Sequence, residues 1–92
     1  MALTFEWDSN KAKSNLEKHQ LAFEEAATVF ADTNSLTIDD PAHSVNEKRH
    51  ITLGKSQSKR LLVVVHTERG DKIRIISARL ASKKERQQYE QK

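Results

Sequence analysis

Cysteine is absent from this chain of 92 residues, and proline, tryptophan and tyrosine occur once each. Without thiols there is no disulfide and no thiolate metal site. Glycine occurs only at Gly54 and Gly70, so a Gly-rich phosphate loop is excluded. The four histidines show neither an HExxH pair nor another recognised ligand spacing, and a nucleophile elbow is missing too. The sequence therefore predicts neither a metal nor a cofactor.

Long apolar runs are missing as well. None approaches the length that spans a membrane, and residues 1–20 lack a signal-peptide pattern. A chain of this length suffices for one small domain, 1–92, with one modest core. Although 32% of the residues are charged, the aliphatic residues gather in segments, which indicates a folded domain. We therefore expect one cytoplasmic domain with no membrane partner.

Positive charge is absent from one long stretch, because residues 20–47 contain no Lys or Arg. Six carboxylates lie there, at Glu24, Glu25, Asp32, Asp39, Asp40 and Glu47. From Lys48 onward the cations clearly outnumber the carboxylates, and the whole chain has a net charge of +3. A basic half fits a polyanionic partner, and it fits an ordinary solvated surface equally well.

Local patterns predict an α+β domain with the element order β-α-α-β-β-β-β-α. Asp8 suits an N-cap and opens a helix that runs to about His19. From Phe23, apolar residues recur at i, i+3, i+4 and i+7, which predicts a second helix. A capping box at 82–85 opens the last helix. The predicted strands are 3–7, 35–39, 47–55 and the two halves of a central hairpin over 59–79. We expect an antiparallel sheet covered by the helices on one side.

The central hairpin organises this sheet, since both of its strands are apolar on both faces. If Gly70-Asp71 forms a two-residue loop, His66 and Arg79 lie on the same face. If residues 56–59 form a four-residue loop, Arg49 lies opposite His66. This register predicts that Arg49, His66 and Arg79 share one face, and a slip of one residue would reverse each assignment.

Each of these residues also has a purely structural explanation. His66 can be a core histidine bonded to a backbone carbonyl, which is as plausible as catalysis. Arg49 and Arg79 can be rim residues paired with carboxylates, and Arg74 can extend to the sheet edge. Tyr89 can simply dock the last helix.

The ordered set of segments, taken together, resembles the BrnT family of toxins from type II toxin–antitoxin pairs. The resemblance spans nearly the whole chain, and it rests on order and spacing rather than on one diagnostic motif. The segments are Phe5-Glu6-Trp7-Asp8, Lys18-His19, Phe23-Glu24-Glu25-Ala26, Glu47-Lys48-Arg49, LLVVVHTERGDKIRIISAR at 61–79 and Glu85-Arg86-Gln87-Gln88-Tyr89. This chain has Gln20 where a glycine commonly follows Lys-His in such sequences.

The resemblance implies a RelE-like ribonuclease fold and inhibition of translation by RNA cleavage. It also implies neutralisation by a BrnA-type antitoxin, within a heterotetramer of two toxins and two antitoxins. In such complexes the antitoxin supplies the DNA-binding element, so DNA is a partner only through it. The positions that match the family pattern are Arg49, Arg74, Arg79, Lys18, His19, His66 and Tyr89.

Metal-free RNA cleavage suggests a role for each of these positions. Arginine stays charged and its fork matches phosphate oxygens, so we expect Arg49 and Arg79 to hold phosphate. His66 titrates near neutral pH and would transfer protons, with Tyr89 in support. Lys18, His19 and Arg74 would bind substrate. The alternatives are a non-catalytic module that binds RNA or protein, and a subunit that acts mainly as a repressor scaffold with its antitoxin.

Overall fold

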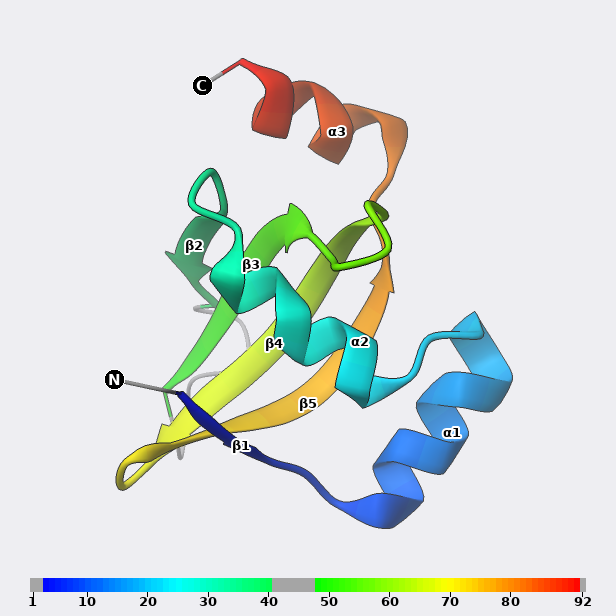
Figure 1. The fold of residues 1–92 in the computed structure, drawn as a ribbon, viewed down its shortest axis with the longest axis vertical. Helices are drawn as coiled ribbons and strands as arrows, with labels where there is room; N and C mark the ends of the chain where they lie inside the picture. Colours follow the sequence, from blue (N-terminus) through cyan, green and yellow to red (C-terminus); the bar gives the residue numbers. More distant parts are fainter. Residues whose placement is uncertain (1–2, 41–47, 92) are drawn as a thin grey trace.

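The computed structural model describes residues 3–40 and 48–91 and contains a five-stranded sheet with three α-helices (Figure 1). The elements are β1 (Thr4–Glu6), α1 (Ser9–His19), α2 (Phe23–Ala27), the 3-10 helix η1 (Thr28–Ala31), β2 (Leu36–Asp39), β3 (Arg49–Lys55), β4 (Leu61–Arg69), β5 (Lys72–Leu80) and α3 (Lys83–Glu90). The spatial order of the strands is β1-β5-β4-β3-β2. The α+β class is confirmed.

The sheet is mixed, whereas the sequence predicted an antiparallel one. β1 pairs with β5 in parallel, and Phe5 lies opposite Ile73. Aromatic contacts hold this short strand in place: Phe5 of β1 packs on Phe30 at 5.3 Å between ring centroids, and Trp7, directly after the strand, meets Phe23 at 5.9 Å. These contacts join residues that are distant in the chain, so the local pattern of β1 did not reveal its direction.

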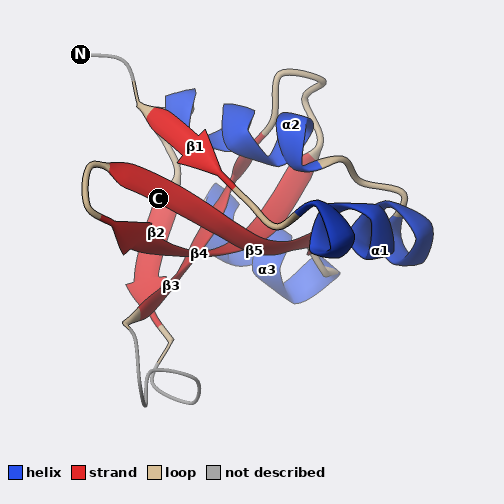
Figure 2. Cartoon of the chain, turned by 90° about the horizontal axis from the view of Figure 1, so that it is seen from below, coloured by secondary structure: helices blue, strands red, loops and turns tan. Residues whose placement is uncertain are grey.

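The two faces of the sheet are covered differently, as Figure 2 shows. We call the face under α1 and α2 the helix face, and the opposite face the open face. Alternate residues of β4 point to opposite faces. Val64 points to the helix face and belongs to the main core with Phe23 and Leu21, while Val63 packs with Leu53 and Leu61 on the open face. Tyr89 of α3 joins this second cluster. The helices therefore lie on both sides, and the predicted one-sided layer is wrong.

The helix ends follow the sequence signals. The carboxylate of Asp8 accepts from the Asn10 N–H at 3.1 Å, as expected of an N-cap. Ser82 and Glu85 form the predicted capping box at the start of α3. α1 ends at Gln20, which adopts the left-handed conformation (φ 56°, ψ 37°) and donates its N–H to the Leu16 carbonyl. The turn that a glycine would favour is thus made by glutamine.

Asn15 joins α1 to the edge of β5. β1 pairs with residues 72–74 of β5. Further along the same edge of β5, a side chain of α1 takes the place of a strand. The Ala78 N–H donates to Asn15 Oδ1 at 3.1 Å, and Asn15 Nδ2 donates to the Leu21 carbonyl at 3.0 Å. Asn15 is 6% exposed. One buried amide therefore holds the helix, the following loop and the strand together.

The register between β3 and β4 differs by one residue from the predicted one. The Lys59 N–H donates to the Ser56 carbonyl, and the Ser56 N–H donates to the Arg60 carbonyl, both at 2.8 Å. Lys59 has φ of 65°. The loop is thus a turn closed by a left-handed residue, with three residues instead of four. Arg49 consequently lies opposite Thr67.

A second irregularity separates β5 from its predicted register. The pairing of β4 with β5 shifts between Val65 and His66, as a β-bulge does. Near the Gly70 turn the expected pairing holds, but beyond the bulge Arg79 lies opposite Val63. Arg79 therefore points to the open face.

Candidate functional site

His66 points to the helix face, away from the predicted partners. Its Nε2 lies 2.7 Å from Thr52 Oγ1, and its ring meets the edge of Phe30 at 4.8 Å between centroids. The residue is 6% exposed. Arg49 and Arg79 share the open face, as predicted, but the prediction that His66 joins them is wrong.

The surroundings of His66 favour its neutral form. Burial, with a smaller contribution from His50, lowers the pKa of His66 to about 4. The two imidazole rings stack at 5.6 Å, and His50 Nδ1 lies 3.1 Å from Asp39 Oδ1. Among the described residues, the buried Nδ1 of His66 has no hydrogen-bond partner. This geometry is that of a core histidine.

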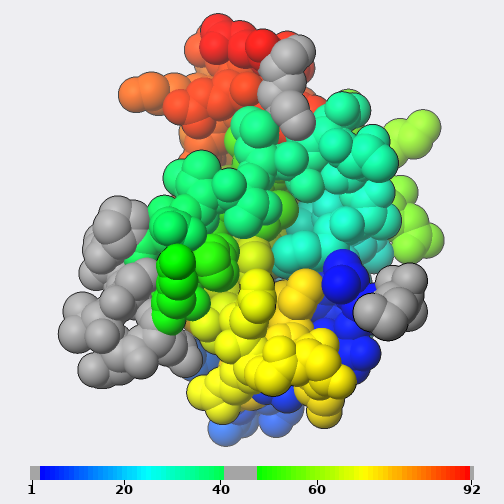
Figure 3. Space-filling view, turned by 90° about the vertical axis from the view of Figure 1, so that its left-hand side faces the viewer, coloured from blue at the N-terminus to red at the C-terminus, as the bar shows by residue number. Residues whose placement is uncertain are grey.

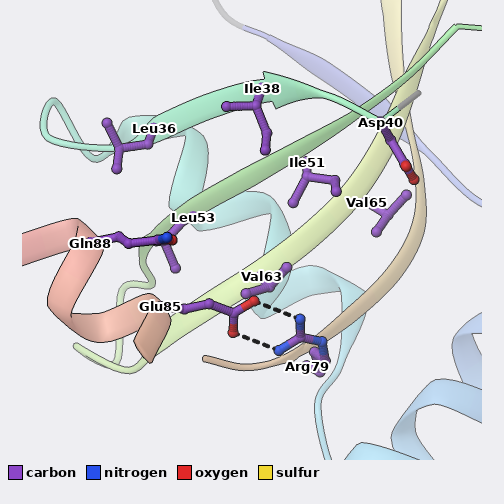
Figure 4. A pocket seen from close by; sticks show the side chains of 10 residues that line it. All are labelled: Leu36, Ile38, Asp40, Ile51, Leu53, Val63, Val65, Arg79, Glu85 and Gln88. Atoms are coloured by element: carbon purple, nitrogen blue, oxygen red, sulfur yellow. Dashed lines mark hydrogen bonds and ion pairs between the residues drawn. The ribbon is translucent and has the colours of Figure 1, made fainter. Parts of the chain in front are cut away.

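The open face carries a groove of about 390 Å³ (Figure 4). Its floor comes from β2, β3 and β4, and Arg79 and α3 form one wall. The lining residues are Leu36, Ile38, Asp40, Ile51, Leu53, Val63, Val65, Arg79, Glu85 and Gln88. Arg49 lies on the same face, two residues along β3 from Ile51. The groove thus combines an aliphatic floor with Arg79 in one wall, and Arg49 lies on the same face outside the lining.

Arg79 forms a two-pronged ion pair with Glu85 of α3. Nη1 lies 2.8 Å from Oε1 and Nη2 lies 2.8 Å from Oε2, while Nη1 also donates to the Leu80 carbonyl. The hydrogen bonds from Arg79 lower the pKa of Glu85 to about 2 although partial burial opposes the shift. The fork that binds this carboxylate also matches two phosphate oxygens.

Tyr89 anchors α3 through Asp32. Its hydroxyl donates to Asp32 Oδ2 at 2.7 Å, and this bond raises the pKa of Tyr89 to about 12. The same Asp32 oxygen accepts the Lys55 N–H at 2.9 Å. Figure 3 shows α3 at one end of the molecule, over the segment that leads from η1 into β2. The tyrosine therefore fixes the helix that carries Glu85.

The predicted substrate-binding residues lie at the β5 side. Arg74 is on the open face and pairs with Glu6 of β1 at 3.1 Å. Lys18 and His19, at the end of α1, line a hollow of about 180 Å³ together with Ser77. Ser77 lies opposite Val65, on the same face as Arg79. The hollow therefore meets the open face at the edge of β5.

Glu85 is a functional candidate that the sequence presented only as a capping residue. Its position six residues after Arg79 does not reveal the contact, because the chain turns between β5 and α3.

Among the described residues, no group of three or more His, Asp or Glu side chains is placed to hold a metal ion. Within residues 3–40 and 48–91, no helix has both the length and the apolar character needed to cross a membrane.

Comparison with known proteins agrees with this fold. Residues 7–85 match the sequence model of a family described as the ribonuclease toxin, BrnT, of type II toxin–antitoxin system. None of the curated proteins matches the chain. The crystal structure of the Brucella abortus ribonuclease toxin BrnT is similar in fold, with a TM-score of 0.65, 21% identity and coverage of 89% of this chain and 100% of that one. Because the family match spans most of the sequence, the chain belongs to the BrnT family of ribonuclease toxins of type II toxin–antitoxin systems.

Proposed function

We propose that this toxin cleaves RNA without a metal ion, inhibits translation in the cytoplasm, and holds the scissile phosphate on the open face between Arg49 and Arg79. The bidentate contact of Arg79 with Glu85 carries this proposal. A guanidinium already oriented for two parallel acceptor oxygens is preorganised for a phosphate and for the charge that develops during cleavage. Arg49 lies on the same face, on β3 opposite Thr67, whereas Arg79 lies opposite Val63.

The RNA backbone would reach this position from the end of α1. Lys18 and His19 meet Ser77 in the hollow at the β5 edge, and Arg79 lies two residues further along the same face. Consecutive same-face residues of a strand are about 7 Å apart, close to the spacing of neighbouring phosphates in an extended strand. Arg74 lies on the same strand toward its other end. The substrate-binding residues therefore follow β5.

Proton transfer requires a group other than His66, which is buried on the opposite face. When phosphate takes the place of the carboxylate on Arg79, Glu85 loses the hydrogen bonds that hold its pKa at about 2. Its pKa then returns toward the ordinary carboxylate value, which makes it a better base beside the reacting phosphate. We assign Glu85 to accepting the 2′-hydroxyl proton, while the leaving 5′-oxygen takes a proton from water. Tyr89 supports the site by fixing α3.

Single-turnover cleavage and equilibrium binding of one RNA, both in EDTA, separate these roles. Arg79→Lys keeps the charge but loses the fork, so cleavage should fall about 100-fold or more while binding changes by less than about threefold. Lys18→Ala should weaken binding and leave the rate at saturating RNA nearly unchanged. Glu85→Gln should slow cleavage without weakening binding.

Two outcomes would contradict the proposal. Equal losses of binding and cleavage in Arg79→Lys would assign Arg79 to holding substrate alone. A wild-type chain that binds RNA in EDTA and never cuts it would support the second candidate, a non-catalytic binding module. The occupied fork of Arg79 and the burial of His66 are the observations that favour that candidate.

Membership in a type II toxin–antitoxin family implies an antitoxin partner. We propose that this partner is of the BrnA type, that two copies of each protein form a heterotetramer, and that DNA is bound through the antitoxin. Light scattering of the co-expressed pair measures the stoichiometry. A mobility-shift assay with operator DNA should retard the complex and leave the toxin alone unbound.

A further inference from the structure

The open face presents three rows of side chains that cross the sheet. The first row lies under α3 and joins Arg79, Val63, Leu53 and Leu36. The second joins Ser77, Val65, Ile51 and Ile38, and the third joins Arg74, Thr67, Arg49 and Asp40. Successive rows are about 7 Å apart, because side chains on one face of a strand recur at every second residue. We call Val65, Ile51 and Ile38 the aliphatic row; it lies between two rows that carry charged groups.

The groove is larger than a phosphate site requires. Its volume of about 390 Å³ extends from α3 to Asp40, directly after β2, whereas the proposed phosphate contact uses Arg79 in one wall (Figure 4). A phosphate gains nothing from the aliphatic row, since an ion that leaves water for an apolar surface loses its hydration. This row therefore fits another part of the RNA.

A nucleobase has the shape and polarity that the aliphatic row can hold. Pockets for small ligands are mostly apolar and contain a few polar groups that fix the orientation. Enzymes that take a base out of its stack hold its faces against apolar or aromatic side chains and bind its edge by hydrogen bonds. Among the described residues that line the groove, none is aromatic. Because aliphatic side chains contact each base alike, selection among the bases falls to the polar groups of the lining.

Asp40 is the polar group at the end of the groove away from α3. Its side chain lies near Val65 (Figure 4), and the residue is 9% exposed. Its N–H donates to the Arg49 carbonyl at 2.9 Å, which fixes its place in the third row. An ionised carboxylate only accepts hydrogen bonds, and its two oxygens have about four lone pairs. Asp40 can therefore accept from a ligand in addition to groups of the protein.

Two neighbouring acceptor oxygens favour guanine over the other bases. The Watson–Crick edge of guanine presents adjacent N1–H and N2–H donors, which a carboxylate accepts as a pair. Adenine and cytosine present one amino group beside an unprotonated ring nitrogen, which a carboxylate oxygen would repel. Uracil has one N–H between two carbonyls, so it offers a single donor flanked by repulsive groups.

We propose that the aliphatic row is the base-specificity subsite of this ribonuclease, and that Asp40 selects guanine at the nucleotide next to the scissile phosphate. This inference rests on the proposed phosphate site at Arg79. An RNA backbone along β5 directs the base across β4 and β3, with its face on Ile51 and Val65 and its Watson–Crick edge toward Asp40. The enzyme then cuts single-stranded RNA beside guanine.

The test measures cleavage of short single-stranded RNAs in EDTA by the full chain. The cut position is first mapped on an RNA that contains every dinucleotide, and the RNAs then differ only in carrying guanine, inosine, adenine or uracil there. The proteins are the wild type, Asp40→Asn and Asp39→Asn. Asp39 is the matched control, because it loses the same charge but lies opposite His50 on the helix face, with a side chain that is 64% exposed. Circular dichroism verifies that each variant folds.

The wild type should cut the guanine RNA about 100-fold faster than the adenine or uracil RNA, as a bidentate contact with a base edge allows. Inosine keeps N1–H but lacks the N2 amino group, so its RNA should be cut about tenfold more slowly than the guanine RNA. Asp40→Asn should reduce the preference for guanine over adenine to less than about threefold, whereas Asp39→Asn should retain it.

Three results would overturn the inference: a wild type that prefers uracil, an Asp40→Asn variant that still prefers guanine, and equal rates on guanine and inosine. The inosine comparison needs no variant, so it decides the matter even where Asp40→Asn fails to fold.

Arg79→Lys separates this inference from the function it rests on, because it should slow cleavage of each RNA by a similar factor and leave the ratio of guanine to adenine unchanged. Wild-type cleavage without base preference refutes the subsite alone. If the wild type does not cut, binding of the same RNAs decides: an affinity for guanine that Asp40→Asn abolishes supports the subsite and refutes cleavage. Base-independent binding, or none, then refutes both.

Discussion

At the scale of single residues, Gln20 and Lys59 both take backbone conformations that glycine adopts more easily, with φ of 56° and 65°. A non-glycine residue in the left-handed region lowers the stability of the folded state by about 1 kcal/mol, because its Cβ comes too close to the backbone. Gln20 caps α1 directly after Lys18 and His19, and Lys59 closes the turn between β3 and β4. The chain thus tolerates local strain where a sharp turn is required.

Gln20→Gly is therefore expected to raise the free energy of unfolding by about 1 kcal/mol, because glycine removes the strain at the C-cap. Lys13→Gly, in the exposed middle of the same helix, should lower it by about 1 kcal/mol. Urea unfolding of the two variants and the wild type measures both changes. A destabilised Gln20→Gly would show that the glutamine side chain contributes more than its backbone costs.

His66 should make stability depend on pH. Its pKa is lowered to about 4 in the folded protein, against about 6.5 in an unfolded chain. The unfolded state therefore binds more protons between these values, so stability is complete above about pH 6.5 and is lost as the pH falls toward 4. From pH 8 to pH 5 the loss from this residue is about 2 kcal/mol.

His66→Gln removes this titration while its amide can still bond Thr52. Urea unfolding at pH 8 and pH 5 should show that the wild type loses about 2 kcal/mol more than the variant over this interval. Equal losses in both proteins would mean that His66 is not buried in its neutral form.

At the scale of elements, the sheet edge at β5 is closed by different groups along its length. β1 pairs with residues 72–74, and the Asn15 side chain satisfies the N–H of Ala78. α3 is held in a similar way, through Tyr89 on Asp32 and Glu85 on Arg79. Side chains thus dock both helices that flank the proposed RNA path.

Asn15→Ala should lower the free energy of unfolding by about 2 kcal/mol, because it leaves the Ala78 N–H and the Leu21 carbonyl without their partner. Asn15→Asp keeps the acceptor for Ala78 and should be less harmful at neutral pH. Asn10→Ala, an exposed asparagine of the same helix, serves as control with a change below about 0.5 kcal/mol. Thermal and urea unfolding measure the series, and equal effects at positions 10 and 15 would refute the bridge.

At the scale of the whole molecule, charge is divided along the chain. Residues 1–47 contain three Lys and Arg against nine Asp and Glu, and residues 48–92 contain thirteen against four. The fold brings the two halves together locally: Glu25 of α2 binds Arg60, in the loop before β4, in a two-pronged pair, and the hydrogen bond from Arg60 lowers the pKa of Glu25. Along β5 the open face carries a line of three cations, Lys72, Arg74 and Arg79, of which Arg74 is paired with Glu6 and Arg79 with Glu85.

This line predicts how salt affects RNA binding. If about four phosphates contact the chain, the slope of log K against log salt is about −3 for a single strand. Lys18→Ala should reduce its magnitude by about 0.7, whereas Lys59→Ala, in the loop between β3 and β4, should leave it unchanged. Binding titrations at several salt concentrations give these slopes, and equal slopes for both variants would place the RNA elsewhere.

Local signals in the sequence predicted most elements correctly. The Asp8 cap, the end of α1 near His19 and the Ser82 capping box depend on neighbours in the chain, and all three are present. The second helix was predicted to continue to Phe30, but it changes to a 3-10 turn after Ala27. The family was identified by the order of its segments, since no single residue was specific to it.

Tertiary structure alone decided which side chains meet. Side chains alternate along a strand, so the three-residue loop closed by Lys59 and the bulge beside His66 each reversed a face assignment. They separated His66 from Arg49 and Arg79, while the turn after β5 set Glu85 on Arg79. Composition, charge and family were thus determined by the sequence itself, because they are properties of the residues and their order, and the caps were determined because they depend on residues close together in the chain. The geometry of the proposed site was not determined by the sequence alone. It depends on the β-bulge between β4 and β5 and on contacts between elements that are distant in the chain.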